Sequence, residues 1–352
     1  MELLDYLRGA VEQGASDVFF VAGGPACCKL DGHLHPLREE KLLPAQTERL
    51  ITQIYERAQR EQGRFRTTGD DDFSFAVPGL ARFRVNAYRQ RGSCAAVVRV
   101  VSFEIPDWAK LGIPERVMGL ADVTHGMVLI SGTAGSGKST TQACIIDRIN
   151  RSRDVHIITL EDPIEFLHRD QKSIVSQREI AIDTADYPAA LRACLRQAPD
   201  VILLGEMRDY ETIRTAMTAA ETGHLVIATL HTRGAVTTVD RIVDSFPAEQ
   251  QAQARVQLSM VLHAVASEQL LPDEEGGLVP AFELMFVNPA IRNLIRDHKS
   301  YQIDSVIQTS GAEGMIAMDQ SIAGLYRAGK ISARTAETYA VNPDQLRRQL
   351  GL

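Results

Sequence analysis

The chain has 352 residues, which is enough for about two domains of ordinary size. Hydrophobic residues make up 45% of the sequence and charged residues 24%, a globular composition that excludes a largely disordered chain. The formal net charge of −7 argues against a general nucleic-acid-binding protein, because such proteins usually carry an excess of basic residues on their surface.

Signals for secretion, membrane insertion and disulfide formation are missing from the sequence. The N-terminus, Met1-Glu-Leu-Leu-Asp5, is acidic and lacks the basic-then-apolar pattern of a signal peptide. No run of about 18 apolar residues occurs, so we expect no direct membrane insertion. The cysteines form no CxxC pair, and we expect free thiols in a reducing cytosol at Cys27, Cys28, Cys94, Cys144 and Cys194.

Residues 1–101 predict a small α+β domain. Leu3–Gln13 has the spacing of an amphipathic helix, with its leucines and Val11 on one stripe. Further elements are expected as a strand at Val18–Ala22, a helix at Thr47–Arg60, and strands at Phe73–Val77, Arg82–Arg89 and Cys94–Val101. Residues 102–114 hold two prolines and the lone Trp108 without any period, which indicates a linker.

From about residue 115 to residue 352 the pattern indicates a second domain. Short apolar strands alternate with helices, which is typical of a mainly parallel sheet covered on both faces. The expected strands are Met127–Ile130, Val155–Leu160, Val201–Leu204 and Leu225–Thr229. The expected helices include Thr140–Asn150, Tyr187–Arg196 and Tyr210–Thr222. After Gly234 the chain becomes mostly helical, apart from strand-like runs at Ala264–Leu271 and Leu278–Phe286.

The most informative motif lies between the first strand and the first helix of this second domain. Residues 132–139 read Gly-Thr-Ala-Gly-Ser-Gly-Lys-Ser, a complete G-x-x-x-x-G-K-[ST] phosphate-binding loop (P-loop). Lys138 is expected to reach the β- and γ-phosphates of ATP, and Ser139 to ligate Mg²⁺. The expected nucleotide-binding residues are Gly132, Thr133, Ala134, Gly135, Ser136, Gly137, Lys138, Ser139 and Thr140.

Two acidic segments follow at strand ends, where open α/β sheets place their ligands. Glu161-Asp-Pro-Ile-Glu165 carries three carboxylates, one of which can orient an attacking water beside a γ-phosphate. Asp200-Val-Ile-Leu-Leu-Gly-Glu206 ends in an acid, and we expect Glu206 to take part in Mg²⁺ and water coordination. The alternative for each segment is an acidic turn that caps the following element.

Histidines and arginines supply the remaining candidates. His224 and His231 bracket a strand and lie too far apart to share one metal, and His231, at the carboxyl end, is placed to sense a γ-phosphate. P-loop hydrolysis often depends on an arginine from another subunit. Residue types alone do not choose among the candidates in the first domain, which are Arg82, Arg84, Arg89, Arg91 and Arg99.

Together these segments resemble the secretion ATPase superfamily, and within it the type IV pilus retraction ATPases. The resemblance covers residues 1–340 and includes Gly14-Ala-Ser-Asp17, Gly79-Leu-Ala-Arg-Phe-Arg-Val-Asn86, the P-loop, Glu161–Glu165, Val201–Glu206 and Gly223–Thr232. Ala290-Ile-Arg-Asn-Leu-Ile-Arg296 resembles the AIRNLIRE signature of retraction ATPases, with Asp297 in place of the final Glu.

The resemblance implies an α/β fold, with a RecA-like P-loop NTPase domain and a smaller PAS-like N-terminal domain. It implies a cytoplasmic homohexamer that uses ATP and Mg²⁺ and is recruited to an inner-membrane pilus platform protein, with or without a second pilus ATPase. It assigns the general base to Glu165, Mg²⁺ and water coordination to Glu206, and γ-phosphate contacts to Arg84 and Arg99. ATP binding and hydrolysis would change the angle between the two domains across the linker, and these changes would drive the removal of pilin subunits.

Other functions remain open at this stage. A pilus-extension or type II secretion ATPase has the same fold, but such proteins resemble longer chains with a tetracysteine zinc motif, and here no cysteine follows Cys194. An accessory retraction ATPase would look the same in sequence. A nucleic-acid translocase is disfavoured by the negative net charge, and a scaffold that binds ATP only to assemble differs by the absence of turnover.

Overall fold

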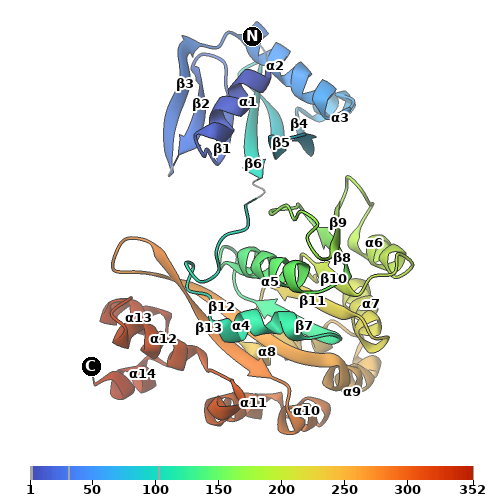
Figure 1. Ribbon diagram of the computed structural model, residues 1–352, viewed down its shortest axis with the longest axis vertical. Coiled ribbons are helices and arrows are strands. Elements are labelled where there is room, and N and C mark those ends of the chain that lie inside the picture. Colours follow the sequence, from blue (N-terminus) through green and yellow to red (C-terminus); the bar gives the residue numbers. More distant parts are fainter. Residues whose placement is uncertain (1–2, 31, 102–103, 352) are drawn as a thin grey trace. The chain divides into compact units, whose positions relative to one another are not determined.

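A computed structural model describes residues 3–30, 32–101 and 104–351 (Figure 1). The described chain separates into two compact units. One holds the residues up to Glu104 together with Glu165–Leu167, and the other holds Ile105–Ile164 and the residues from His168 onward. Residues 102 and 103 of the expected linker lie outside the described residues.

The N-terminal unit is a six-stranded antiparallel sheet in the order β3-β2-β1-β6-β5-β4. Its elements are α1 (Leu3–Glu12), β1 (Asp17–Phe20), β2 (Pro25–Leu30), β3 (His33–Lys41), α2 (Pro44–Arg57), α3 (Gly63–Thr68), β4 (Asp70–Val77), β5 (Ala81–Gln90) and β6 (Ser93–Val101). Apolar side chains of α1 and α2 pack on the inward-facing residues of the sheet, among them Phe20 and Phe83. The α+β expectation is confirmed for this unit.

Some elements of this unit carry no clear sequence signal. β3 reads His-Leu-His-Pro-Leu-Arg-Glu-Glu-Lys and forms an edge of the sheet. It is exposed along nearly all of its length, with only Leu37 half-buried against the core. Charges and a proline are what edge strands tolerate, and they hide the period of a strand. β2 and the short α3 were likewise not expected from the sequence.

The second unit contains a seven-stranded sheet in the order β13-β12-β7-β11-β10-β8-β9. Its strands are β7 (Gly126–Ser131), β8 (His156–Glu161), β9 (Ile174–Glu179), β10 (Val201–Leu204), β11 (Leu225–Leu230), β12 (Leu262–Pro272) and β13 (Leu278–Phe286). Neighbouring strands run parallel except β13, which is antiparallel to β12. The mainly parallel sheet is thus confirmed, although the polar edge strand β9 was not expected.

Helices cover this sheet on both faces and extend beyond it (Figure 1). They are α4 (Glu115–Met118), α5 (Lys138–Ser152), α6 (Tyr187–Cys194), α7 (Tyr210–Glu221), α8 (Ala235–Asp244), α9 (Gln251–Val261), α10 (Pro289–Arg296), α11 (Ile303–Thr309), α12 (Met318–Arg327), α13 (Ala333–Tyr339) and α14 (Pro343–Leu350). Short 3₁₀ turns lie at Gly119–Asp122, Ala248–Gln250, Ser300–Gln302 and Gly311–Glu313. None of the helices in the described part of the chain is both long and apolar enough to cross a bilayer.

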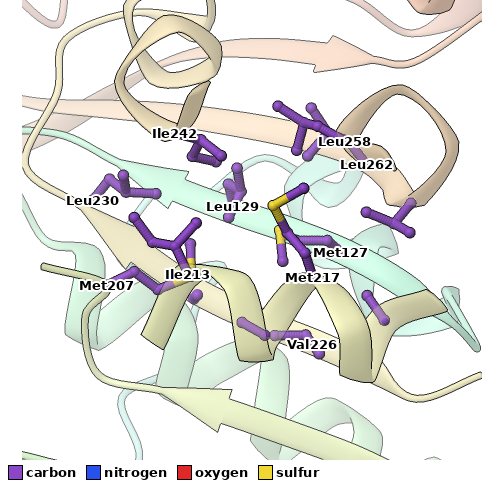
Figure 2. Packing of buried hydrophobic residues seen from close by; sticks show 14 of the residues in the cluster. Met127, Leu129, Met207, Ile213, Met217, Val226, Leu230, Ile242, Leu258 and Leu262 are labelled. Atoms are coloured by element: carbon purple, nitrogen blue, oxygen red, sulfur yellow. The ribbon is translucent and has the colours of Figure 1, made fainter. Parts of the chain in front are cut away.

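Strand β7, which lies inside the sheet between β12 and β11, is buried on both faces. Met127 and Leu129 pack in one core with side chains of α7, α8 and α9, as Figure 2 shows for Met217, Ile242 and Leu258. The alternate residues of β7 pack in a second core against α5. Truncating a leucine in such a core costs about 2–5 kcal/mol, so the carboxyl end of β7 is a rigid support for the loop that follows it.

Candidate functional site

The loop between β7 and α5 turns on glycines in the left-handed region. Gly135 has a φ of 74° and Gly137 a φ of 101°, conformations that side chains of L residues rarely adopt. A Cβ at Gly132 would lie 2.5 Å from the carbonyl oxygen of Glu268 on β12. These positions require glycine because of backbone conformation at two of them and close packing at the third.

Lys138, the first residue of α5, folds back over the loop. Its Nζ donates hydrogen bonds to the carbonyl oxygens of Gly132, at 3.0 Å, and Thr133, at 2.7 Å, and the residue is only 7% exposed. Ser136 Oγ is buried without a hydrogen-bond partner, whereas Ser139 and Thr140 are partly exposed at the start of α5. The loop thus gathers an ammonium group and polar groups around a helix N-terminus, which is suited to phosphate.

Glu206 follows β10 at the same edge of the sheet and is 7% exposed. One carboxylate oxygen is ion-paired with Arg208, and the other, Oε2, lies 3.4 Å from His231 Nε2 without forming a hydrogen bond. Parallel pairing of β10 with β11 brings the two residues together, because each follows the carboxyl end of its strand. His224 lies at the other end of β11, where its Nδ1 is 3.0 Å from the carbonyl oxygen of Ala219.

The three carboxylates of the acidic segment that begins at the end of β8 lie in different environments. Oε1 of Glu161 accepts hydrogen bonds from Thr159 Oγ1, at 2.6 Å, and from Gln177 Nε2, at 3.2 Å. This oxygen therefore holds neighbouring side chains in place. Asp162 precedes a cis peptide bond to Pro163 and is exposed. Glu165 is exposed in the loop that joins β8 to β9.

The arginines of the N-terminal unit lie on β5, β6 and the turn between them. Arg84 is the direct cross-strand partner of Arg99, so the two side chains share one sheet face. Arg99 Nε donates to Asp17 Oδ1 at 2.9 Å, while the guanidinium of Arg89 lies over the Phe65 ring. Like charges directly opposite each other destabilise a sheet, and Asp17, the cross-strand partner of Arg99 on β1, offsets part of this repulsion.

Two site residues escaped the sequence analysis. Tyr187 begins α6, and its Oη is buried without a hydrogen-bond partner, 2.8 Å from where a Cβ at Gly205 would lie. Burial, followed by the charges of Glu206 and Asp162, raises the pKa of its phenol. Glu268 on β12 is buried beneath the P-loop. Neither residue belongs to a recognisable motif, because each lies near the P-loop or Glu206 only as a result of the tertiary structure.

Comparison with known proteins places this geometry in a family. The family model described as Type II/IV secretion system protein matches residues 2–317. The chain is 45% identical to the type IV pilus retraction ATPase PilT of Pseudomonas aeruginosa, over 98% of this chain and 99% of that protein. The chain belongs to the type II/IV secretion system protein family. Within that family it is an ATPase.

Further relatives agree with this assignment. A twitching motility protein of Neisseria gonorrhoeae is 42% identical over 98% of this chain and 92% of its own length. A crystal structure of the pilus retraction motor PilT with bound ADP superimposes with a TM-score of 0.89 at 44% identity, covering 99% of both chains. The expected α/β fold and the use of a nucleotide by this ATPase are thereby confirmed.

The oxygen atoms at the site fit a magnesium ion that is shared with phosphates. Mg²⁺ is usually bound through one or two protein oxygens plus substrate phosphates and water. Ser139 lies at the start of α5, and Glu206 Oε2 is a buried oxygen with no hydrogen-bond donor. The described residues contain no cluster of three or more metal-ligating side chains.

Replacing Tyr187 with phenylalanine should stabilise this ATPase and slow it. Removing an unsatisfied buried hydroxyl should raise the free energy of unfolding by about 1 kcal/mol. The hydroxyl has no hydrogen-bond partner among the described residues and is therefore free to donate to charge on a bound nucleotide, so its loss should lower kcat at least about tenfold. Thermal denaturation and steady-state turnover test both effects. Tyr210→Phe is the matched control, since the Tyr210 hydroxyl donates to Gln250 at an exposed position. Unchanged kcat in Tyr187→Phe would exclude the hydroxyl from turnover.

Proposed function

We propose that this chain is the ATP-hydrolysing motor of type IV pilus retraction and works as a homohexameric ring. The observation that carries the proposal is a complete P-loop with Glu206 and His231 assembled at one sheet edge, in a chain similar to a pilus retraction ATPase over 98% of its length. Removal of pilin subunits at the pilus base would be the work performed, with twitching motility as its visible result.

Each site residue has a role in this proposal. The P-loop and Lys138 bind the phosphates, Glu165 takes the proton of the attacking water, and Glu206 holds that water in place. Arg84 and Arg99 offset the charge that develops on the γ-phosphate, while His231 reports the state of that phosphate to the Glu206 carboxylate beside it. Mg²⁺ would be held by Ser139 and Glu206 and would neutralise charge on the phosphate oxygens.

The proposed partners follow from the same function. The ring would work in the cytoplasm, recruited to the cytoplasmic face of the inner membrane by a pilus platform protein. Residues 1–101 and 115–352 would act as separate domains whose relative angle changes across residues 102–114 during turnover. Neither nucleic-acid binding nor direct membrane insertion has a place in this mechanism.

The segment that resembles the retraction signature forms α10. Ile291 and Ile295 are buried in the core, whereas Arg292, Asn293 and Arg296 are exposed. Arg292 Nε donates to the carbonyl oxygen of Ser259 on α9, at 3.2 Å. Its two isoleucines thus anchor this helix, while its arginines remain on the surface and outside the P-loop.

Replacing Arg296 with alanine should uncouple ATP turnover from retraction. Arg296 is exposed and pairs with Asp297, so its loss should change stability by less than about 0.5 kcal/mol. We expect turnover within about twofold of the parent protein and loss of twitching in cells that carry the variant. Arg334→Ala, at an exposed arginine of α13, is the control. Normal twitching in Arg296→Ala would argue against a coupling role.

The decisive experiment measures Mg²⁺-dependent ATP hydrolysis and solution mass of the purified chain under the same conditions. Turnover by a hexamer, with twitching lost on deletion of the gene, supports a primary retraction motor. Turnover only with a second pilus ATPase identifies an accessory motor, and loss of piliation on deletion identifies an extension ATPase. Salt-sensitive stimulation by DNA would instead indicate a nucleic-acid translocase.

A further inference from the structure

A buried carboxylate lies directly beneath the phosphate-binding loop. β12 pairs with β7 up to the match of Ser267 with Ser131, and Glu268 is the next residue along β12. It is 2% exposed. A Cβ placed at Gly137 would collide with its carboxylate, just as one at Gly132 would collide with its backbone carbonyl. Glu268 therefore supports both ends of the loop through direct packing.

The carboxylate has two polar neighbours on α5. The hydroxyl of Thr141, itself fully buried, donates to Oε2 at 2.9 Å. Lys138 exerts an electrostatic attraction on the carboxylate. Burial raises the pKa of Glu268 to about 8, and Thr141 and Lys138 oppose that rise without cancelling it. Glu268 thus changes charge near neutral pH beside the cation that binds phosphate.

Other groups around Glu268 do not compete for this role. Cys144 on α5 has a pKa raised to about 12 by burial, so its thiol stays neutral. On the neighbouring strand β13, the apolar Phe282 is paired with Glu268. Glu283 on β13 is influenced by Asp304 and Asp319. Among the described residues, Lys138 is the one cation whose charge acts on the Glu268 carboxylate.

We propose that Glu268 is a positioning residue of the P-loop whose protonation is coupled to nucleotide binding. This inference rests on the phosphate-binding role of the loop. A charged Glu268 draws the Lys138 ammonium toward the base of the loop and repels phosphate, whereas a neutral Glu268 leaves Lys138 to the nucleotide. The bound form therefore prefers the proton on Glu268, and nucleotide binding takes up a proton when Glu268 is ionised in the free protein.

The direction of the pH dependence follows from linkage. The pKa of Glu268 is about 8 in the free protein and higher still with a nucleotide bound, because bound phosphate disfavours the carboxylate. Affinity is therefore full below the free pKa and falls as pH rises through and above it. Between pH 7 and pH 9 the Kd for Mg-ADP should increase by roughly fivefold to tenfold.

Calorimetric titration of the full-length protein with Mg-ADP tests the coupling. At pH 8.5, titrations in two buffers with different ionisation enthalpies give the number of protons taken up. The parent protein should take up a large fraction of one proton, and Glu268→Gln should take up far less and show a flatter dependence of Kd on pH. Equal proton uptake and equal pH profiles in the two proteins would overturn the proposal.

A second variant keeps the Glu268 carboxylate and changes its pKa. Thr141→Val removes the donor that favours the ionised form, so the fall in affinity should shift to higher pH. No shift, or a shift to lower pH, would contradict the coupling even if Glu268→Gln failed to fold. Failure of the parent protein to bind Mg-ADP would instead reject the phosphate-binding role of the loop. Binding by the parent with unchanged titration in both variants would reject only the role of Glu268.

Discussion

Replacing Lys138 with alanine is expected to abolish ATP turnover almost completely. The ammonium group already lies over the loop, held at 2.7 Å and 3.0 Å by the carbonyl oxygens of Thr133 and Gly132. These carbonyls keep it within the loop, so binding a nucleotide requires only that it turn toward phosphate. Removing a preorganised donor of this kind costs about 10²–10³-fold in kcat. Nucleotide affinity should fall as well, because the same charge attracts the ground-state phosphates.

A control variant at another lysine distinguishes loss of the phosphate-binding group from a general loss of positive charge. Lys172 is half-exposed and lies 3.6 Å from Asp154, so Lys172→Ala removes one positive charge without touching the P-loop. Its turnover should match that of the parent protein within about twofold, since exposed pairs contribute little. Thermal denaturation of both variants checks that folding is intact. Appreciable turnover by Lys138→Ala with normal stability would mean that another cation binds the phosphates.

The fold of the second unit was largely predictable from its buried strands. Val201–Leu204 and Leu278–Phe286 were predicted with the bounds that the structure gives them. Continuous apolar runs bounded by polar residues mark a strand that is buried on both faces. The strands that escaped prediction lie toward the sheet edges, including β9, whose sequence Ile-Val-Ser-Gln-Arg-Glu is mostly polar and half-buried and has no such run. Their positions depend on pairing with a neighbour rather than on local composition.

Some site residues could likewise be predicted from the sequence around them, whereas others depend on contacts with distant parts of the chain. The P-loop, Glu206 and His231 each follow an apolar strand, so chain order together with the rule for strand ends predicted their neighbourhood. Glu268 lies 127 residues after its partner Thr141, within a run that indicates only a strand. Its role depends on the register of β12 against β7, which no sequence period fixes. The position of Tyr187 was equally unpredictable, because its hydroxyl lies near Glu206 and Asp162 only where α6 packs close to Gly205.

The acids at the strand ends are not equivalent, and their surroundings separate their roles. Glu161 accepts hydrogen bonds from Thr159 and Gln177, and Glu206 is ion-paired with Arg208 through one oxygen while its other oxygen lies 3.4 Å from His231 Nε2. A general base needs a carboxylate that is free to accept a proton from water. Glu165 is exposed and follows the strand that ends at Glu161. These surroundings are the reason for proposing Glu165 rather than Glu161 as the base.

Replacing Glu165 with glutamine should therefore stop turnover while leaving nucleotide affinity intact. The amide has the same shape but cannot take the proton of the attacking water, and loss of a general base costs about 10²–10⁴-fold in rate. Binding should persist, since the P-loop and Lys138 are untouched. Steady-state hydrolysis and titration with a fluorescent ADP analogue measure the two quantities separately. Because an ATP-bound ring would accumulate, the variant should also form the proposed hexamer in ATP.

Glu161→Gln provides the comparison that makes the assignment testable. Its Oε1 accepts two hydrogen bonds, so the amide should lower the free energy of unfolding by about 1–3 kcal/mol while turnover falls far less than in Glu165→Gln. The opposite ranking, with Glu165→Gln active and Glu161→Gln inactive but folded, would transfer the base to Glu161. Near-normal turnover in both variants would point to Glu206, a buried carboxylate that follows the carboxyl end of β10, and Glu206→Gln would then decide whether it takes the proton.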